Sequence, residues 1–363
     1  MTRPRAREAG VSFGVLPTGP RNMITDVPGV KVGHCTISMG KGKLAKGQGP
    51  VRTGVTAVVP SGKNLFESPV KGGFFDLNGC GGLQGSLQIE EFGIIETPIM
   101  LTNTMSMGAV SDATVRYMLR LNKDAGIEGE AIIPIVSECD DSFLNDARGL
   151  HVHEEHVKAA LDDASDVVRE GAVGAGTGMT SYDFKGGIGT SSRIVKIDGK
   201  KYTLGAIVLA NHGDRAELVI DGVPIGRLLD VENPRRKENG SIVMVVGTDA
   251  PLDARQLRRL ARRTALGLAV TGSCSHNGSG DIGLAFSTAN VHNRCEHKGL
   301  VTDSTLQDCE ISPLFRATMD STSEAIINAL FKAETTDGRD GNVSPALPIE
   351  STLELLRTYR HLK

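Results

Sequence analysis

The stretch RRKENGSIVMVVGTD, residues 235–249, runs from charged residues through Asn-Gly-Ser directly into an apolar segment. Asn-Gly is a turn signal, because both residues tolerate positive φ values. One interpretation is therefore a polar loop that leads into a buried strand at residues 242–246. A second interpretation makes Ser241 a nucleophile that becomes a new chain terminus once the bond before it is cleaved. The remaining sequence decides between the two.

Composition excludes several classes of partner. The chain has 363 residues, with 40 Lys and Arg against 43 Asp and Glu, and a formal net charge of -3. Proteins that bind a phosphate backbone need an excess of positive charge, so nucleic acid is not an expected partner. Aromatic residues make up only 4% of the chain and Trp is absent, which also argues against a platform for stacked bases. The length is sufficient for the large core of a globular enzyme.

Cysteine usage and the lack of long apolar segments indicate a soluble cytoplasmic protein. The six cysteines include no C-x-x-C pair, which argues against a zinc ribbon or a disulfide framework and leaves free buried thiols as the expectation. Residues 1–20 lack an apolar core of about seven residues, and no segment reaches about 18 apolar residues, so we expect no membrane partner. The cysteines are Cys35, Cys80, Cys139, Cys274, Cys295 and Cys309.

The order of expected strands and helices indicates an α+β protein. The expected strands and helices come in mixed blocks and do not alternate strictly as βαβ units. This order favours a layered arrangement over a doubly wound sheet. Strands are expected at residues 27–37, 54–60, 131–136, 194–197, 202–210, 217–220, 242–246 and 283–287. Helices are expected at residues 105–121, 154–169, 253–270, 312–334 and 350–359. No repeat or low-complexity linker interrupts the chain, so we expect one domain over residues 1–363.

Local signals refine some of these elements. Asp198-Gly199 predicts a hairpin turn between two strands. The hydroxyls of residues 102–104 are candidate caps for the helix that follows them. Pro134 indicates an edge or a bulge in the strand at residues 131–136, which we expect to end in the acidic loop SECDDSFLND. Residues 234–239, PRRKEN, form the most linker-like piece of the chain.

Three histidines in GLHVHEEHV, namely His151, His153 and His156, raise the question of a metal site, since imidazole is the commonest metal ligand. Their spacing does not match H-E-x-x-H, and a junction between strand and helix would place the rings on different faces. We therefore expect solvated or capping histidines and no metal.

The most glycine-dense stretch begins with GAVGAGTGMT, residues 171–180. It resembles a dinucleotide-binding fingerprint only in its glycines, because a helix precedes the loop and the required order of strand and helix is reversed. We expect an irregular loop whose backbone closely approaches either a substrate or a neighbouring strand, and no cofactor.

Three polar turns form the remaining candidate site. They are the Gly240-Ser241 junction, LANHG around Asn211, and HNGSGDIGLAFST around Ser279 and Asp281. Each by itself is ordinary turn chemistry. Each also lies at the edge of an expected strand, where a rigid scaffold can hold catalytic groups.

Together with other segments, these turns resemble the family of L-aminopeptidase/D-esterases and β-peptidyl aminopeptidases, which are self-processing serine peptidases. The resemblance is carried by ITDVPGVKVGHCTI, LNDARGLHV, GAGTGM, ANHG, NGSIVMVVGTDAPL and NGSGDIGLAFST, within residues 24–290. It implies a four-layer α/β/β/α sandwich that resembles N-terminal nucleophile hydrolases but has different connectivity. It also implies a homotetramer of processed heterodimers.

By this resemblance, the chain cleaves itself between Gly240 and Ser241 into residues 1–240 and 241–363. Ser241 then gains a free α-amino group whose reference pKa of about 7.7–8.0 leaves it partly neutral at pH 7. This amine can accept the proton of the Ser241 hydroxyl, so no catalytic histidine is required.

The resemblance also assigns roles to the other turns. Asn211 would help to form the oxyanion hole, and Ser279 and Asp281 would orient and polarise the nucleophile and its amine. Glu138 would pair with the free N-terminal ammonium of the substrate. Two residues beyond that position some members have a Tyr that contributes to the active site, whereas this chain has Asp140. With Asp141 close by, we expect a substrate pocket that favours a cationic amino end.

The expected function is therefore a serine aminopeptidase that needs no metal or cofactor and releases N-terminal residues from short peptides, amino acid amides or esters. The sequence leaves L-, D- and β-amino acids open as the released residue. One alternative is a self-processing acyltransferase of the ornithine acetyltransferase type, which uses Thr as its nucleophile and is disfavoured by Ser241. Another is a non-catalytic ligand-binding relative, which would remain uncleaved.

Overall fold

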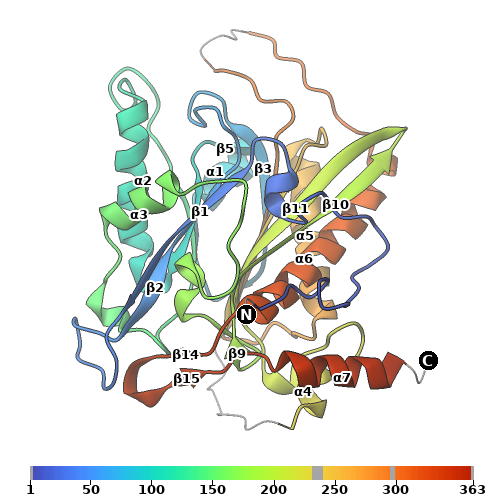
Figure 1. The fold of residues 1–363 in the computed structure, drawn as a ribbon. Helices are drawn as coiled ribbons and strands as arrows, with labels where there is room; N and C mark the ends of the chain where they lie inside the picture. The colour runs from blue at the N-terminus through green and yellow to red at the C-terminus, as the bar shows by residue number, and fades with distance from the viewer. Residues whose placement is uncertain (1–2, 231–239, 295–298, 361–363) are drawn as a thin grey trace.

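Two β-sheets lie face to face, and helices cover the outer side of each sheet (Figure 1). The structure is a computed structural model that describes residues 3–230, 240–294 and 299–360. Helices α2 and α3 pack on one sheet, while α5 and α6 pack on the other. The expected α/β/β/α sandwich is therefore confirmed. The linker-like residues 234–239 lie outside the described residues.

The first sheet has five strands in the order β1-β2-β6-β7-β4, of which only β6 and β7 are parallel neighbours. Its outer face is covered by α2 and α3. The strands are β1 (Lys31–Met39), β2 (Val51–Val59), β4 (Leu83–Gln84), β6 (Ile99–Asn103) and β7 (Ile135–Cys139), and the helices are α2 (Met107–Leu121) and α3 (Glu154–Asp162).

The second sheet has six strands in the order β10-β11-β12-β13-β3-β5, and β12 and β13 are its parallel pair. Its outer face is covered by α5 and α6. The strands are β3 (Val70–Gly79), β5 (Ile94–Ile95), β10 (Gly187–Ile197), β11 (Lys200–Asn211), β12 (Ser241–Thr248) and β13 (Gly280–Ser287), and the helices are α5 (Ala254–Val270) and α6 (Ser312–Lys332).

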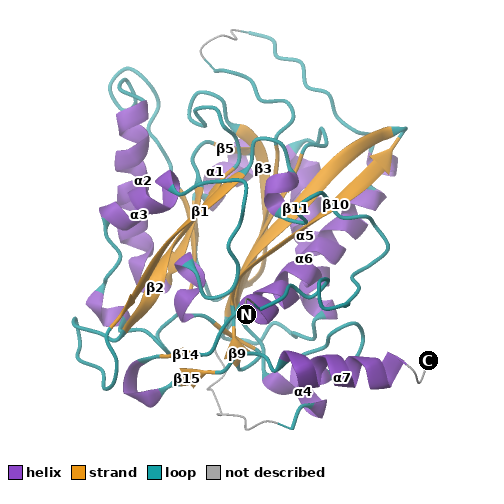
Figure 2. Cartoon of the chain, in the orientation of Figure 1, coloured by secondary structure: helices purple, strands orange, loops and turns teal. Residues whose placement is uncertain are grey.

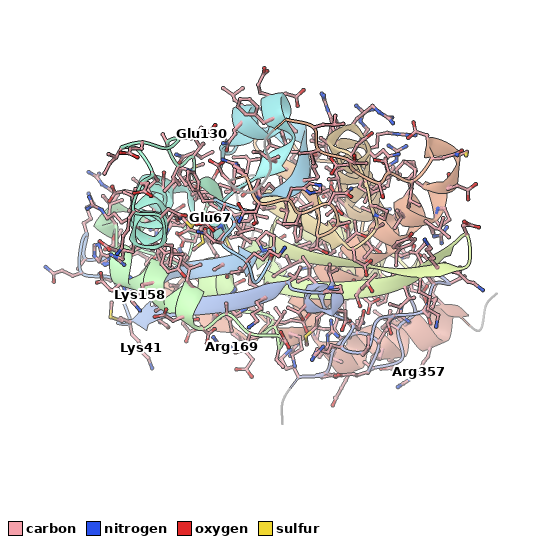
Figure 3. The ribbon with its side chains drawn as sticks, turned by 90° about the horizontal axis from the view of Figure 1, so that it is seen from above. Lys41, Glu67, Glu130, Lys158, Arg169 and Arg357 are labelled. Carbon is pink, nitrogen blue, oxygen red and sulfur yellow. The ribbon has the colours of Figure 1, made fainter. Side chains whose placement is uncertain are left out.

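Short elements border the two sheets (Figure 2). They are α1 (Ser86–Phe92), α4 (Ile225–Leu228), α7 (Ile349–Arg360), β8 (Thr180–Ser181), β9 (Phe184–Lys185), β14 (Thr336–Asp337) and β15 (Val343–Ser344). Charged side chains such as Lys158 on α3 and Arg357 on α7 are exposed on the outside of the layers (Figure 3). None of the described helices is long and apolar enough to cross a membrane.

Strand β12 explains why the sequence after Ser241 is apolar without alternation. Ile242, Met244 and Val246 belong to the core between the second sheet and its helices. Val243 and Val245 belong to the core between the two sheets. Because a strand projects successive side chains to opposite faces, a central strand buried on both faces must be apolar throughout.

Several expected elements differ in extent. The strand expected at residues 131–136 begins only after Pro134 and continues through Glu138 to Cys139, so part of the expected acidic loop is strand. Proline has no N–H to donate to the ladder, which is consistent with this later start. The helix expected at residues 154–169 ends at Asp162, because Ser165 exchanges two backbone hydrogen bonds with Val32 of β1.

Other expectations were wrong in kind. Residues 217–220 form no strand, since a 3₁₀ turn occupies Arg215–Glu217. The hydroxyls of residues 102–104 do not cap the turn before α2, because the Asn103 side chain accepts that bond from the Ser106 N–H at 2.9 Å.

Of the described cysteines, all of which are free, only Cys139 is fully buried, so the expectation of buried thiols holds for that residue alone.

Candidate active site

The ends of the central strands bring the three predicted polar turns together. Ser241 is the first residue of β12 and is paired with Asn211, the last residue of β11. On its other side Ser241 is paired with Gly280, the first residue of β13. Ser279 and Asp281 flank Gly280 in the chain. Segments distant in sequence therefore converge at one end of the central strands of the second sheet.

Ser241 is buried and lies next to a thiol that the sequence analysis did not single out. Its side chain interacts with the thiol of Cys139, the last residue of β7, and this interaction by itself lowers the pKa of the thiol. Burial raises the pKa of the Cys139 thiol well above its usual range. Cys139 also contacts the carbonyl oxygen of Leu209, with a distance of 3.5 Å from Sγ to that oxygen. The first sheet therefore contributes to the surroundings of Ser241.

Gly240 must be a glycine for reasons of space. A Cβ atom at this position would lie 2.7 Å from the Asn211 carbonyl oxygen and 2.7 Å from the His212 Cα, closer than side chains are found to approach. The Gly240 carbonyl oxygen accepts a hydrogen bond from the Gly280 N–H at 3.3 Å. The peptide bond before Ser241 is therefore held between β11 and β13.

The Asn211 side chain is fixed at both ends. Its Nδ2 donates to the carbonyl oxygen of Asp140 at 2.9 Å, and its Oδ1 accepts from the Thr180 N–H at 2.8 Å. An amide held in this way is oriented before any substrate arrives, as an oxyanion donor should be.

Asp281 is buried beneath two hydroxyl donors. Ser279 Oγ donates to Asp281 Oδ1 at 2.6 Å, and the Ser275 hydroxyl donates to Oδ2. Burial raises the pKa of Asp281, while the two hydrogen bonds act in the opposite direction. Ser279 and Asp281 are thus hydrogen-bonded to each other, and Ser275 is a further partner of Asp281 that sequence reasoning missed.

Glu138 lies near the end of β7 in the first sheet, close to the start of β13 in the second sheet. Its Oε1 accepts from the Gly82 N–H at 2.8 Å, and its Oε2 accepts from the Thr104 hydroxyl. Burial raises the pKa of this carboxyl. A Cβ atom on Gly81 would lie 3.3 Å from Glu138 Oε1 and 3.1 Å from the Gly280 Cα. Gly81 therefore separates Glu138 from the strand that pairs with Ser241.

The other two acids of this segment lie in different surroundings. The Asp140 side chain is exposed and accepts hydrogen bonds from the Ser142 N–H and hydroxyl at 2.8 and 2.9 Å. Asp141 is only 1% exposed and accepts from Asn145 Nδ2 at 2.9 Å, and burial raises its pKa to about 7. The expectation that Asp141 adds to a pocket favouring a cationic amino end of the substrate is therefore not supported, since its carboxyl lies in the interior.

The three histidines have separate local partners. His151 Nε2 contacts Asp146 Oδ2 at 3.0 Å. His156 Nδ1 accepts from the His153 N–H at 2.9 Å at the start of α3, so this pair has the capping role that was expected. In the described part of the chain, the metal-ligating side chains that converge are instead Glu217, Cys274 and His276.

The glycine-dense segment approaches a neighbouring strand. A Cβ atom on Gly174 would lie 2.4 Å from Thr56 Oγ1, and one on Gly178 would lie 2.2 Å from the Arg52 carbonyl oxygen. Both contacts are to β2. Of the two alternatives left by the sequence, close packing on a strand accounts for these glycines.

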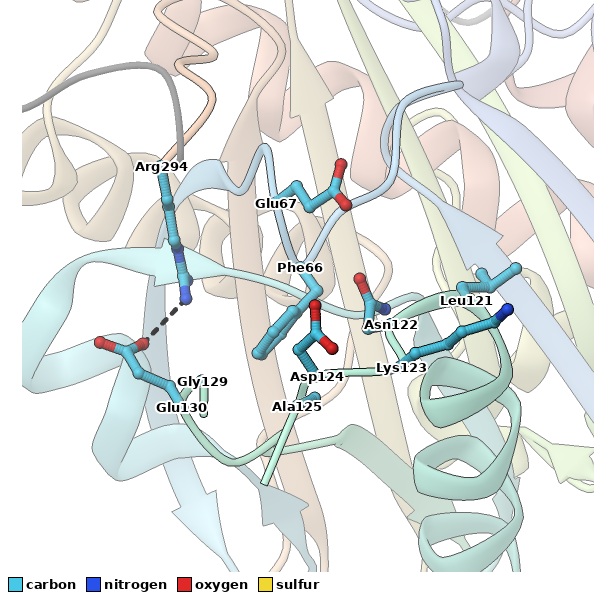
Figure 4. Close-up of a pocket in the computed structure, with 10 residues that line it drawn as sticks. All are labelled: Phe66, Glu67, Leu121, Asn122, Lys123, Asp124, Ala125, Gly129, Glu130 and Arg294. Atoms are coloured by element: carbon cyan, nitrogen blue, oxygen red, sulfur yellow. Dashed lines mark hydrogen bonds and ion pairs between the residues drawn. The ribbon is translucent and has the colours of Figure 1, made fainter. Parts of the chain in front are cut away.

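A separate cavity of about 500 Å³ lies at the other end of the strands (Figure 4). Its lining includes Phe66, Leu121 and Arg294, and Arg294 forms an ion pair with Glu130 at 3.0 Å. Its lining residues precede β3, lie between the end of α2 and the start of β7, or follow β13. The candidate site lies instead where β3 and β7 end. This cavity is therefore not part of the candidate active site.

The α/β/β/α sandwich places this chain with proteins whose fold is a variant of the N-terminal nucleophile hydrolase fold. The L-aminopeptidase D-Ala-esterase/amidase of Ochrobactrum anthropi, described as a prototype of the serine aminopeptidases and a new variant of that fold, superimposes with a TM-score of 0.93. The two chains are 38% identical, with 99% of this chain and 100% of the other covered. The PH0078 protein of Pyrococcus horikoshii superimposes with a TM-score of 0.95 at 50% identity, with 98% and 99% covered.

The sequence comparisons agree with the structural ones. The model of Peptidase family S58 matches residues 22–344. The beta-peptidyl aminopeptidase BapA of Sphingosinicella microcystinivorans is 41% identical over 375 residues, which cover 99% of this chain and 93% of the relative. The chain therefore belongs to Peptidase family S58, and it is an aminopeptidase.

Proposed function

We propose that this aminopeptidase activates itself by cleaving the Gly240–Ser241 bond and then uses Ser241 as its N-terminal nucleophile. The observation that carries the proposal is the strand register, which puts Ser241 between Asn211 and Gly280 directly after a glycine that no other residue could replace without a clash. Cleavage would divide the chain into residues 1–240 and 241–363.

The self-cleavage step follows from ordinary acyl chemistry. The Ser241 hydroxyl oxygen attacks the Gly240 carbonyl carbon, the C–N bond breaks, and the Ser241 nitrogen takes up the proton that the hydroxyl releases. Water then hydrolyses the resulting ester and returns the hydroxyl to Ser241. The new α-amine, with a reference pKa of about 7.7–8.0, serves as the general base in later turnovers.

In each turnover the Ser241 oxygen would attack the carbonyl carbon of the substrate's first residue. The amine or alcohol bonded to that carbon would leave with a proton, and water would then hydrolyse the ester to Ser241. Asn211 would stabilise the negative charge on the carbonyl oxygen, and the Ser279–Asp281 pair would hold the amine and hydroxyl in position. Glu138 would bind the substrate's own ammonium group through a charge-assisted hydrogen bond. Asp140, whose exposed side chain lies two residues further along, would border the amino end of the substrate.

The substrates that we propose are short peptides, amino acid amides and esters with a free amino terminus. Relatives named for β-peptidyl aminopeptidase and for L-aminopeptidase activity make β- and L-amino acid derivatives the first compounds to compare. Parallel hydrolysis of β-alanine and L-alanine p-nitroanilides would rank the two classes. Failure to hydrolyse any such compound would contradict the proposed substrate class.

Self-processing is tested by a denaturing mass measurement on the purified chain. The 38.4 kDa chain should yield fragments of about 25 and 13 kDa, in proportion to their 240 and 123 residues. A full-length chain that persists on storage would instead favour a non-catalytic relative.

Replacing Asn211 with Ala is expected to lower kcat by about 10²–10³-fold, because one oxyanion donor contributes about 2.7–4 kcal/mol to transition-state stabilisation. The rate should be measured on fully processed enzyme, since the same substitution could also slow self-cleavage. Asn64→Ala provides a matched control at the far end of the molecule, where the Asn64 side chain donates to Asn122. An unchanged kcat in the Asn211 variant would remove this residue from the oxyanion hole.

Dialysis against EDTA is expected to leave hydrolysis intact, because the nucleophile, the base and the oxyanion donor all belong to the chain. The measurement is the rate before and after chelation, with added zinc as the control. A loss of activity that zinc restores would argue that a bound metal ion is needed for hydrolysis.

We also propose that the processed chain assembles as a homotetramer, as the family resemblance implies, and that it is cytoplasmic, as its cysteine usage suggests. Sedimentation velocity of the processed enzyme tests the assembly, and a monomeric species at working concentration would contradict it.

A further inference from the structure

Three metal-ligating side chains converge beside the candidate active site. The ligand atoms of Glu217, Cys274 and His276 all lie within 4.8 Å of one another. Glu217 ends the 3₁₀ turn that follows β11, whereas Cys274 and His276 lie in the segment that leads into β13. Two separate parts of the chain therefore supply the three groups.

The distances within this group match those between the ligands of a tetrahedral zinc ion. Cys274 Sγ lies 3.6 Å from His276 Nε2, which lies 3.0 Å from Glu217 Oε1. Bond lengths of about 2.3 Å to sulfur and about 2.0–2.1 Å to nitrogen or oxygen, at tetrahedral angles, give separations of about 3.6 Å and 3.3 Å. The two distances that join His276 Nε2 to its neighbours therefore suit ligands of one shared ion.

The surrounding contacts hold the Glu217 side chain and the backbone of His276 in place. Glu217 Oε2 accepts from the Asp214 N–H at 3.1 Å, which leaves Oε1 facing His276. The His276 carbonyl oxygen accepts from Asn78 Nδ2 at 2.6 Å and from the Ser279 N–H at 2.8 Å. Because Cys274 is exposed and the side chains of His276 and Glu217 are partly exposed, a cation can reach the group from solvent.

We propose that Cys274, His276 and Glu217 bind a zinc-type divalent cation. Asp214, whose Oδ2 lies 3.8 Å from His276 Nε2, or a water molecule would be the fourth ligand. A thiolate together with an imidazole selects zinc over magnesium or calcium, which prefer oxygen ligands. Binding converts the Cys274 thiol to a thiolate and releases its proton to solvent.

This site would brace the active-site loop and would not supply catalytic chemistry. Ser275, which donates a hydrogen bond to Asp281, lies between the two ligands Cys274 and His276. The cation would tie this segment to Glu217, beyond the end of β11. The proposal concerns cation binding and remains testable even if self-cleavage at Ser241 does not occur.

Cobalt(II) is the probe for the test, because it replaces zinc and gives an absorption band when bound to a thiolate. Titration of the full chain should give this band with a stoichiometry of one ion per chain, and zinc should displace the cobalt. The titration is repeated on Ser241→Ala, which has no free Ser241 amine to act as a competing ligand. The same result is expected there.

Cys274→Ser should abolish the band, and His276→Ala should weaken cobalt binding by more than the roughly 10–100-fold that loss of a partner of a metal ligand costs. Cys309→Ser is the matched control, since Cys309 is also exposed but lies outside the group, and it should bind cobalt like the unmodified chain. Circular dichroism establishes that each variant is folded. If Cys274→Ser does not fold, Glu217→Gln is measured instead, with weaker binding expected. Cobalt binding that is unchanged in both Cys274→Ser and His276→Ala would overturn the proposal. Cobalt binding that is lost in Cys309→Ser would overturn it too.

Discussion

Replacing Ser241 with Ala is expected to leave the chain whole at 38.4 kDa and without measurable hydrolysis. The methyl group has no oxygen to attack either the Gly240 carbonyl or a substrate, so both self-cleavage and turnover should stop. Removal of the nucleophile from a serine peptidase lowers kcat on the order of 10⁶-fold. Denaturing mass spectrometry and p-nitroanilide hydrolysis, measured on the same preparation, check the two effects.

Ser241→Cys is the appropriate companion variant, because it keeps an attacking group of similar size at the same position. It should be cleaved, although more slowly, and should retain part of the activity. If Ser241→Ala were cleaved into the same two fragments, another protease would be responsible. If Ser241→Ala remained whole and active, the nucleophile would have to be a different residue.

Replacing Glu138 with Gln is expected to lower kcat/KM for aminoacyl amides by about 30-fold or more. Truncating one partner of a buried, hydrogen-bonded charge pair costs about 2–5 kcal/mol, and here the lost pair joins the carboxylate to the substrate ammonium. Gln is nearly isosteric and can still accept from the Gly82 N–H, so the fold of β7 should be retained. Kinetics with free and N-acetylated substrates measure the effect, because acetylation removes the ammonium group.

The pH dependence provides an independent readout of the same carboxyl group. Burial raises the pKa of Glu138 in the free enzyme, so its carboxylate becomes protonated at a higher pH than that of an ordinary Glu. Substrate binding should therefore weaken as pH falls through this raised pKa, and KM should rise. The Glu138→Gln variant should lack this contribution to the KM profile.

Asp140→Asn is the matched control for Glu138→Gln, since it neutralises an exposed carboxylate only two residues away. We expect a much smaller change in kcat/KM from this control. If the Glu138 variant kept both its kcat/KM and its preference for free amines, the ammonium would have to be bound elsewhere. Asp140 would then be the next residue to test, because the Asp141 carboxyl lies in the interior.

The elements that were predicted well are those whose signals are local. The Asp198-Gly199 turn has positive φ values at both residues, 47° and 75°, and joins β10 to β11 as its sequence indicates. The helix α5 begins after Asp253, which caps it by accepting a bond from the Gln256 N–H at 2.7 Å. In both cases the residues that determine the structure are neighbours in the chain.

The elements that were missed depend on distant partners. Strand β3 (Val70–Gly79) contains three glycines and no regular alternation, so nothing in its own sequence marks it as a strand. It forms because β13 pairs with it along its length, and Gly73 packs directly against the backbone of α5. Pairing of this kind cannot be recognised within a window of a few residues.

The sequence by itself determined the chemical groups of the candidate site: a serine directly after a glycine, an amide at Asn211, and the Ser279–Asp281 pair. Tertiary structure alone decided that these groups meet, through the pairing of β11 and β13 with β12, and that Cys139 and Ser275 join them. The physical reason is that side-chain type and short-range periodicity specify which face of a strand is buried. Which strands become neighbours is decided by the burial of whole sheet faces against each other, to which residues from all parts of the chain contribute.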